Sequence, residues 1–406
     1  MGRVSAFSLT LGLALVPSLP LAAAPQPGAT ASDRWTPVVA EVLTPSAAVV
    51  PTVDGLRHLV YELKLLNASR SPANLSAVEV LGGRKGDQIL AAFEGPALTA
   101  RLRTLANGAA ADSSIPPDQA RLVLVDLTLP QGSPAPARLL HRLRLSGSTG
   151  PGPGPAAELN YKAAPLVIEH QVAILGPPLK GPGWVAINGC CRPDGGHRST
   201  GLPIDGQLAF AQRFAVDWMR LDREGRLAVG DLGRVASYPS FGAEVIAVAD
   251  GDVVAVRNDL SDQVPPKLPD PSLISLANVL GNFVVLHVGP EAYALYAHLQ
   301  PGTVQVRAGQ RVKRGQTLGL LGNSGNSSAP HLHFHLMSGP SLGSDGLPYV
   351  INRFALAGQI PEAEADALFS FKGSWSKNLA PKPSVRSNQL PLSLSIIDFP
   401  EAKPAP

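Results

Sequence analysis

Residues 330–335 read Pro-His-Leu-His-Phe-His, and they follow the glycine-rich run Gly-Leu-Leu-Gly-Asn-Ser-Gly-Asn-Ser at residues 319–327. Side chains alternate between the two faces of a β-strand, so His331, His333 and His335 are expected on one face. Three imidazoles are costly in a dry core, because their ring nitrogens need polar partners. Imidazole is also a common ligand of zinc. Since three of only nine histidines fall here, we interpret this stretch as part of a metal site rather than as an ordinary polar strand face.

Further ligands are expected elsewhere, because a catalytic zinc takes about three protein ligands and keeps one position open for water. His197 lies in a loop-like context, and Asp217 lies in the apolar, strand-like run Phe-Ala-Val-Asp-Trp. A lone Asp in such a run is unfavourable unless it is paired, hydrogen-bonded or bound to metal. His298 follows another apolar run, in Leu-Tyr-Ala-His-Leu. Each of these residues alone is more often an ordinary polar residue, but together they indicate a site.

Taken in order, the His, the Asp, Tyr-Ala-His-Leu, Gly-Asn-Ser-Gly-Asn and Pro-His-Leu-His-Phe resemble the lysostaphin/LytM-type zinc metallopeptidases. Most members of that family cut peptide crosslinks of bacterial peptidoglycan, and the resemblance runs from about residue 183 to residue 354. It implies that His197, Asp217 and His333 bind Zn2+. It also implies that His331 and His298 form a catalytic pair that does not bind the metal.

The sequence departs from the family pattern in three places. Asp217 follows His197 by 217 − 197 = 20 residues, far more than is usual, which implies an inserted loop and leaves Asp205 as a rival ligand. We prefer Asp217, because Asp is ordinary in the Pro/Gly turn context of Asp205. His335 stands where the family commonly has Glu, so a contact around the ligands is expected to differ. Residues 259–278, rich in Pro and Asp, interrupt the core.

The first 24 residues read as a secretory signal peptide. A basic start precedes an apolar stretch at residues 7–21, and Ala-Ala-Ala at residues 22–24 resembles a cleavage site. An uncleaved membrane anchor is the alternative, which Pro17 and Pro20 disfavour because they break a short apolar core. No second apolar run of about 18 residues follows, which argues against a multi-pass membrane protein. A net charge of +3 would help retention on an anionic cell wall and is too small to indicate nucleic-acid binding.

The remaining chain, about 380 residues, suffices for two domains. Residues 32–145 often alternate with period two and are punctuated by turn residues, which predicts an antiparallel β-sandwich of immunoglobulin-like type. His58 and His141 are isolated there, and we expect each to be solvated or hydrogen-bonded structurally. The Gly/Pro-rich residues 146–164 are predicted to be a linker.

Residues 165–360 are predicted to be the peptidase domain, built mainly of antiparallel β-strands. Asp-Gly at residues 250–251 joins two apolar runs and indicates a hairpin. The Pro-rich tail at residues 361–406 is expected to add an edge strand or to stay loose. Cys190 and Cys191 are adjacent, and adjacent residues bridge only with strained geometry, so the default expectation is burial as two small side chains.

These observations predict an exported zinc metalloendopeptidase, periplasmic or at the cell wall, that hydrolyses peptide bonds in peptidoglycan crosslinks. His331 would accept a proton from the attacking water, and His298 would donate a hydrogen bond to the developing oxyanion. Two alternatives stay open. One is an inactive cell-wall-binding or activator module with the same fold, and the other is a protease that acts on secreted proteins. The bond that is cleaved and the oligomeric state stay open as well.

Overall fold

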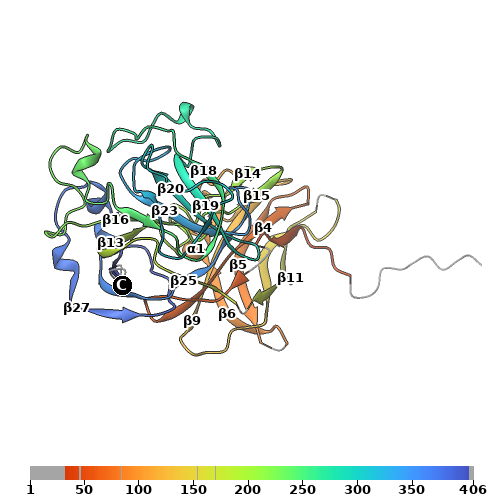
Figure 1. The fold of residues 1–406 in the computed structure, drawn as a ribbon. Helices are drawn as coiled ribbons and strands as arrows, with labels where there is room; N and C mark the ends of the chain where they lie inside the picture. Colours follow the sequence, from red (N-terminus) through yellow and green to blue (C-terminus); the bar gives the residue numbers. More distant parts are fainter. Residues whose placement is uncertain (1–32, 45–46, 84, 153, 170, 402–406) are drawn as a thin grey trace, which may run out of the picture. The chain divides into compact units, whose positions relative to one another are not determined.

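The computed structural model describes residues 33–44, 47–83, 85–152, 154–169 and 171–401 (Figure 1). The signal peptide predicted at residues 1–24 lies outside these ranges. All strands and helices of the described residues belong to one compact unit that begins at Thr36. Within the described ranges, no helix has the length and hydrophobicity needed to cross a membrane.

The first half of the chain forms two sheets that share one hydrophobic core (red to yellow in Figure 1). One sheet has the order β1 (Val38–Val42), β4 (Leu56–Asn67), β9 (Ala120–Pro130), β7 (Leu102–Arg103), and β3 (Val50–Pro51) pairs with β4. The other has the order β2 (Ala47–Ala48), β11 (Ala157–Glu169), β10 (Arg138–Gly147), β5 (Ala73–Gly82), β6 (Gln88–Glu94), and β8 (Ser114–Ile115) pairs with β5. The short helix α1 (Gly95–Thr99) follows β6. A mainly β fold with antiparallel sheets is thus confirmed, whereas the immunoglobulin-like connectivity stays a prediction.

Burial along the strands shows which sheet faces are covered. In β10, buried residues alternate with more exposed ones along the whole strand, as expected when one face meets a core. In β4, residues 58–63 are all buried. The other face of β4 is covered by the second half of the chain, since Val60 packs in the hydrophobic core of that half. Leu122 and Leu124 of β9 likewise pack with Phe210. The outer face of this sheet is therefore a buried interface with the rest of the chain.

The predicted linker at residues 146–164 is wrong at both ends, because residues 146–147 belong to β10. Residues 157–164 belong to β11, which pairs with β10 from Gly147↔Ala157 onward. The Gly/Pro-rich run is therefore the connection between two paired strands. Gly and Pro mark turns as readily as linkers, so composition alone could not separate the two cases.

The second half of the chain is organised by an 11-stranded sheet. Its order is β21 (Arg311–Val312), β18 (Gly251–Arg257), β19 (Asn282–Gly289), β20 (Ala292–Leu299), β23 (Leu332–Met337), β16 (Val216–Arg220), β13 (Gly181–Ile187), β28 (Ser395–Phe399), β26 (Phe354–Gln359), β27 (Leu379–Arg386), and β24 (Gly346–Leu347) pairs with β23. Figure 1 shows β13, β16, β23 and β20 side by side. These four strands carry or flank most of the residues that the sequence nominated.

Three smaller two-stranded sheets complete the β-structure of the described residues. They pair β12 (Ala173–Leu175) with β25 (Tyr349–Ile351), β14 (Leu202–Ile204) with β15 (Gln207–Ala209), and β17 (Glu244–Ile246) with β22 (Thr317–Leu320). The helical segments are short: η1 (Val235–Ser237), η2 (Pro271–Leu273), η3 (Glu362–Glu364), α2 (Ala365–Phe369) and η4 (Ser376–Asn378).

The C-terminal segment is part of the main sheet. β27 lies at its edge, whereas β28 lies inside it, hydrogen-bonded to β13 on one side and β26 on the other. Ile396 and Ile397 are fully buried. The expectation of an edge strand or a loose tail was therefore incomplete, because the apolar residues near the C-terminus fill a position within the sheet.

The two cysteines are joined to each other. Cys190 and Cys191 form a disulfide, and both are buried. Burial was expected, but the default expectation of two free side chains was wrong. The bonded pair follows β13 closely and opens the loop that leads to His197.

Candidate active site

The pairing of two neighbouring strands brings the proposed carboxylate ligand to the second histidine of the His-Leu-His motif. Asp217 on β16 stands directly opposite His333 on β23. Side chains of directly opposed residues lie on the same face of an antiparallel pair. Ala297 on β20 also stands opposite His333, so His298 follows within one residue. The sheet therefore collects three of the nominated residues in one place.

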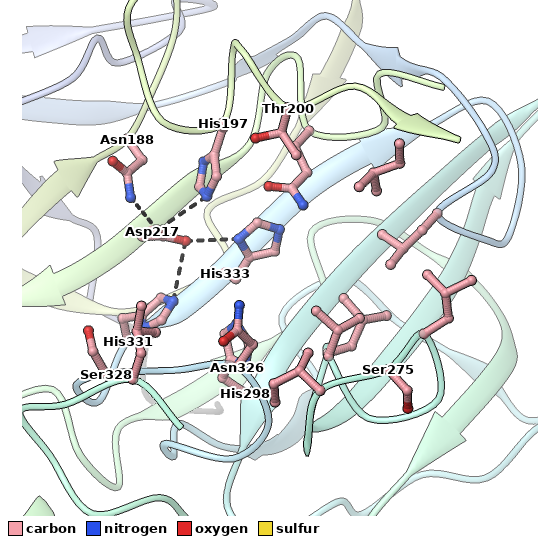
Figure 2. A pocket seen from close by; sticks show the side chains of 18 residues that line it. Asn188, His197, Thr200, Asp217, Ser275, His298, Asn326, Ser328, His331 and His333 are labelled. Carbon is pink, nitrogen blue, oxygen red and sulfur yellow. Dashed lines mark hydrogen bonds and ion pairs between the residues drawn. The ribbon is translucent and has the colours of Figure 1, made fainter. Parts of the chain in front are cut away.

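Asp217 is the centre of the cluster (Figure 2). Its Oδ1 lies 2.8 Å from His333 Nδ1 and 3.3 Å from His331 Nε2. Its Oδ2 lies 3.2 Å from His197 Nε2 and accepts a 2.8 Å hydrogen bond from Asn188 Nδ2. His197 reaches this point from the loop between β13 and β14. All four histidines and the carboxylate proposed from the sequence are thus near neighbours, once His298, whose ring centroid is 4.8 Å from that of His331, is included.

Three of these residues fit a zinc ion by the chemistry of their donor atoms. One ligand atom from each of His197, Asp217 and His333 lies within 4.8 Å of the others. Two imidazole nitrogens and a carboxylate oxygen form a ligand set that zinc accepts in catalytic sites. His298, His331 and His333 form a second group of the same compactness. The carboxylate of the first group makes it the better match for a divalent cation.

Asp205, the rival ligand, lies elsewhere. It occupies the turn between β14 and β15, where Asp205 and Gly206 both have positive φ values of 51° and 77°. Two positive φ values in succession are typical of a type I′ hairpin turn. Asp205 is exposed and belongs to none of the potential metal-binding groups found among the described residues. This position agrees with the turn that the neighbouring Pro and Gly residues predicted for Asp205.

The two remaining histidines are held through their Nδ1 atoms. The Nδ1–H of His298 donates to the Ser324 carbonyl oxygen at 2.7 Å, and that of His331 donates to the Ala329 carbonyl oxygen at 2.8 Å. A carbonyl oxygen can only accept, so each Nδ1 carries the proton. In the neutral rings, Nε2 is left as the proton acceptor. His331 Nε2 points toward Asp217, as Figure 2 shows.

The backbone around His298 is unusually constrained. His298 itself has φ +63°, a conformation that side-chain-bearing residues adopt rarely and that often marks functional sites. Its N–H donates to the Leu280 carbonyl oxygen. Gly281 and Gly325 approach so closely that a Cβ on Gly325 would lie 2.2 Å from Gly281 N. Only glycine fits there, and the contact joins the Gly-Asn-Ser-Gly-Asn motif to the segment that leads into β19.

Electrostatics separate the roles of these groups. Burial raises the pKa of Asp217, but His197 and His331 outweigh this and hold that pKa well below its ordinary value. Burial, reinforced by His331 and His333, lowers the pKa of His298 well below its ordinary value. Burial also lowers the pKa of His331, yet Asp217 outweighs it and the net pKa is raised. Asp217 is therefore ionised, and His298 is neutral at neutral pH.

His335 differs from the other histidines of its strand. It is fully buried. Its ring lies 5.0 Å from that of His333, edge to face. Burial lowers the pKa of His335 well below its ordinary value. This chain therefore places a neutral ring against a proposed ligand.

The cluster lines a cavity of about 620 Å³. Leu268, Ile274 and Leu276 form part of its wall, and they come from the Pro- and Asp-rich insertion at residues 259–278. Asn188 and Asn326 add amide groups; Asn326 ends the Gly-Asn-Ser-Gly-Asn motif, whereas Asn188 was not nominated from the sequence. Asn188 follows the apolar strand β13 immediately, and a polar residue at a strand end was the one available signal. The cavity gives a substrate access to the cluster.

Comparison with known proteins places part of this chain in a family. Residues 235–342 match the family model of Peptidase family M23. The peptidoglycan DD-endopeptidase ShyA of Vibrio cholerae serotype O1 is 44% identical over 135 residues, which are 33% of this chain and 26% of that protein. An uncharacterized metalloprotease of Haemophilus influenzae is 37% identical over 95 residues, which are 23% of this chain and 16% of that protein. These matches span about a quarter or less of the length of the curated relatives.

Among solved structures, a zinc-containing peptidase from Vibrio cholerae is 16% identical, with a TM-score of 0.22, over 71% of this chain and 81% of that one. The family match includes His298, His331 and His333, whereas His197 and Asp217 precede it. The family resemblance inferred from the motifs is confirmed. The chain carries a Peptidase family M23 domain.

Proposed function

We propose that this protein is a zinc-dependent endopeptidase that hydrolyses peptide bonds in the crosslinks of peptidoglycan. The observation that carries the proposal is the convergence of His197, Asp217 and His333 next to His298 and His331, at the wall of a cavity. The substrate class rests on the family match and on the relative described as a peptidoglycan endopeptidase. A substrate in the cell wall agrees with the predicted export to the periplasm or the cell surface.

In this proposal His197 Nε2, Asp217 and His333 Nδ1 hold the zinc. Bound zinc would supply a water whose pKa is lowered to about 7 and would polarise the scissile carbonyl. The carboxylate of Asp217 also accepts from Asn188 Nδ2, which fixes its orientation. Such outer contacts orient a ligand and tune its affinity.

His331 is the proposed proton acceptor, because its Nδ1–H is engaged with the Ala329 carbonyl and Nε2 is directed into the site. It would take a proton from the attacking water at Nε2 and pass it to the leaving amine. Hydrogen bonding of Nδ1 keeps the ring in the tautomer that this role requires.

His298 is proposed to stabilise the oxyanion, with one condition that the geometry sets. Its Nδ1–H is engaged with the Ser324 carbonyl, so only Nε2 can face the substrate. A neutral ring in this tautomer has no proton on Nε2. His298 therefore donates to the oxyanion only after it has gained a proton there, and before that it is a second proton acceptor.

The first test measures the zinc content of the purified mature protein beside Asp217→Ala and the matched control Asp205→Ala. We expect about one zinc per chain in the wild type and in Asp205→Ala, and loss of zinc in Asp217→Ala. His331→Ala should keep its zinc and lose at least 100-fold in turnover, since general-base catalysis contributes about 10²–10⁴-fold.

The same preparations are then incubated with purified peptidoglycan and, separately, with an unfolded protein substrate. Conversion of crosslinked into uncrosslinked peptides by the wild type and Asp205→Ala, but not by Asp217→Ala or His331→Ala, supports the proposed substrate. Cleavage of the protein substrate only would assign the activity to secreted proteins. If the wild type has neither zinc nor either activity, the proposal of an enzyme is wrong and the alternative of a cell-wall-binding module is favoured.

A further inference from the structure

The loop that carries His197, residues 188–201, runs between β13 and β14, and we call it the His197 loop. It belongs to the second half of the chain, yet much of its support comes from the two-sheet N-terminal sandwich. The spacing of 20 residues between His197 and Asp217 includes the end of this loop, residues 198–201, and the β14–β15 hairpin. A ligand on so long a segment would lose much conformational entropy on binding metal, unless the loop that carries it were fixed beforehand.

Arg198, the residue directly after His197, is the main attachment. Only 1% of it is exposed, and its guanidinium reaches into the outer face of the β4–β9 sheet. It forms a short ion pair with Glu62 and donates to the carbonyl oxygens of Tyr61 at 2.8 Å and Val125 at 3.2 Å. Every hydrogen-bond partner found for this guanidinium among the described residues belongs to the sandwich.

Glu62 is fixed in turn by a second arginine. Arg213 Nη2 lies 2.7 Å from Glu62 Oε2 and 3.1 Å from Asp345 Oδ1. Thr44 Oγ1 donates to Glu62 at 2.9 Å. Glu62 is completely buried, and its carboxylate serves both arginines. Removing Arg198 would therefore leave Glu62 with one charged partner rather than none.

Two further contacts hold the flanks of the His197 loop. Arg103 Nη2 donates to the Pro193 carbonyl oxygen at 2.9 Å. Asn107 makes a two-bond contact with Gly201, since its Nδ2 donates to the carbonyl oxygen and its Oδ1 accepts from the N–H, each at 2.8 Å. The loop is thus attached to the sandwich before, at and after its ligand.

We propose that the N-terminal sandwich is a positioning element for the metal site, acting through Arg198 and Asn107 on the loop that presents His197. Neither residue touches the metal position or the substrate. Both hold the backbone that directly follows His197, so they determine how often His197 Nε2 stands opposite Asp217 (Figure 2). The inference rests on the proposed function, because it takes His197 to be a zinc ligand.

The proposal gives the sandwich a role other than that of a detachable cover. A domain that leaves the active site during activation is expected to meet it through a polar, loosely packed surface. Here the contact contains a buried ion-pair cluster and apolar residues shared with the second core, among them Val50, Val53 and Val60. Separation would leave those charges without their partners.

The test compares zinc affinity in the full-length mature protein. Zinc dissociation constants are measured by chelator competition for the wild type, Arg198→Met, Asn107→Gly and the control Arg142→Met. Arg142 pairs with Glu79 at 2.7 Å, and Glu79 keeps Arg144 as a second partner, so the control removes a comparable charge from the sandwich away from the loop. Asn107 has φ +67°, which glycine tolerates, so Asn107→Gly removes only the side-chain amide.

We expect Arg198→Met and Asn107→Gly to bind zinc about 10- to 100-fold more weakly, as is found when outer-shell partners of metal ligands are removed. Arg142→Met should bind as the wild type does. Melting temperatures are recorded alongside, and affinities are compared at a temperature at which every variant is folded. If zinc affinity falls in proportion to the melting temperature in all three variants, the control included, the loss reflects general destabilisation and the proposal is overturned.

Two other results are equally decisive. Wild-type affinity in folded Arg198→Met and Asn107→Gly would refute the positioning role while leaving the enzyme intact. A wild type that binds no zinc would instead refute the proposed function on which the inference rests. If Arg198→Met does not fold, Asn107→Gly decides the matter alone, because its substitution lies in a turn and leaves the ion pairs in place.

Discussion

His141 shows how a single buried imidazole is accommodated inside the sandwich. Its Nδ1–H donates to the Ala164 carbonyl oxygen at 2.7 Å, and Nε2 accepts from the Tyr61 hydroxyl at 2.8 Å. In the neutral ring, Nδ1 is the donor and Nε2 the acceptor, so both nitrogens are satisfied. Burial lowers the pKa of His141 to about 4. The expectation that this isolated histidine is hydrogen-bonded structurally is confirmed by these contacts.

This arrangement predicts an acid-dependent loss of stability. The unfolded chain gains a proton on His141 below pH 6.5, whereas the folded protein does so only near pH 4, so folding is progressively disfavoured between these values. At pH 5 the loss is about 2 kcal/mol relative to pH 7.5. Urea unfolding at both pH values should show a smaller change in the free energy of unfolding for His141→Gln, because glutamine does not titrate.

Other groups titrate in the wild type and in His141→Gln alike. The contribution of His141 is therefore the pH-dependent change in the free energy of unfolding of the wild type minus that of the variant. An identical pH dependence in wild type and variant would show that the ring is protonated in the folded state. The proton signals of the His141 ring give a direct control, since they should not shift between pH 7.5 and pH 5.

Among the elements, β28 is the one whose place matters most for the site. It lies next to β13, and β13 pairs with β16, where Ile187 stands opposite Asp217. The N–H of Leu394, just before β28, donates to the Ala186 carbonyl oxygen. The C-terminal segment therefore helps to fix the strand that precedes the His197 loop.

This position predicts different sensitivities for two apolar residues of the C-terminal segment. Ile397 on β28 is fully buried, whereas Val385 on β27 is 64% exposed. Ile397→Ala should lower the free energy of unfolding by about 2–5 kcal/mol, the usual cost of emptying a core position. Val385→Ala should change it by less than about 0.5 kcal/mol. Denaturant unfolding of both variants checks the difference, and a small effect at Ile397 would mean that β28 detaches readily.

At the scale of the whole molecule, Glu62 links the two halves. Burial raises its pKa, but Arg213 and Arg198 outweigh this, and the pKa of Glu62 is lowered. It is therefore an ionised carboxylate between two buried guanidinium groups. A charge network of this kind need not add net stability, yet removal of its central partner leaves the others uncompensated.

Glu62→Gln should therefore lower the free energy of unfolding by about 3–5 kcal/mol. The control is Glu41→Gln, because Glu41 forms an exposed ion pair with Lys64, and such pairs contribute about 0–1 kcal/mol. Urea unfolding, followed by fluorescence and by far-UV circular dichroism, measures both. We expect one coincident transition for each protein, since the halves share a buried interface. A stable Glu62→Gln variant would show that the arginines find other partners.

Much of the site was readable from the chain because its signals are local. His331 and His333 are recognisable in a His-Leu-His stretch, and Asp217 by its place in an apolar run, where a carboxylate needs a partner. The structure brings these residues together with His197 and His298, and their roles as ligands and catalytic groups await the zinc and activity measurements. Strand periodicity likewise predicted the mainly β architecture, since alternation of burial is a property of single strands.

What only the tertiary structure decided lies in contacts between distant segments. Glu62 and Arg198 are 136 residues apart, and the sequence around either residue does not predict that the two form an ion pair. The register that sets Asp217 opposite His333, the place of β28 within the sheet and the strand at residues 157–169 all depend on which surfaces pack together. By itself the sequence determined the chemical groups and the strands that carry them, because these follow from residue type and short-range periodicity. Their mutual placement was decided by packing and by charge pairing, which act between residues that the chain brings together only on folding.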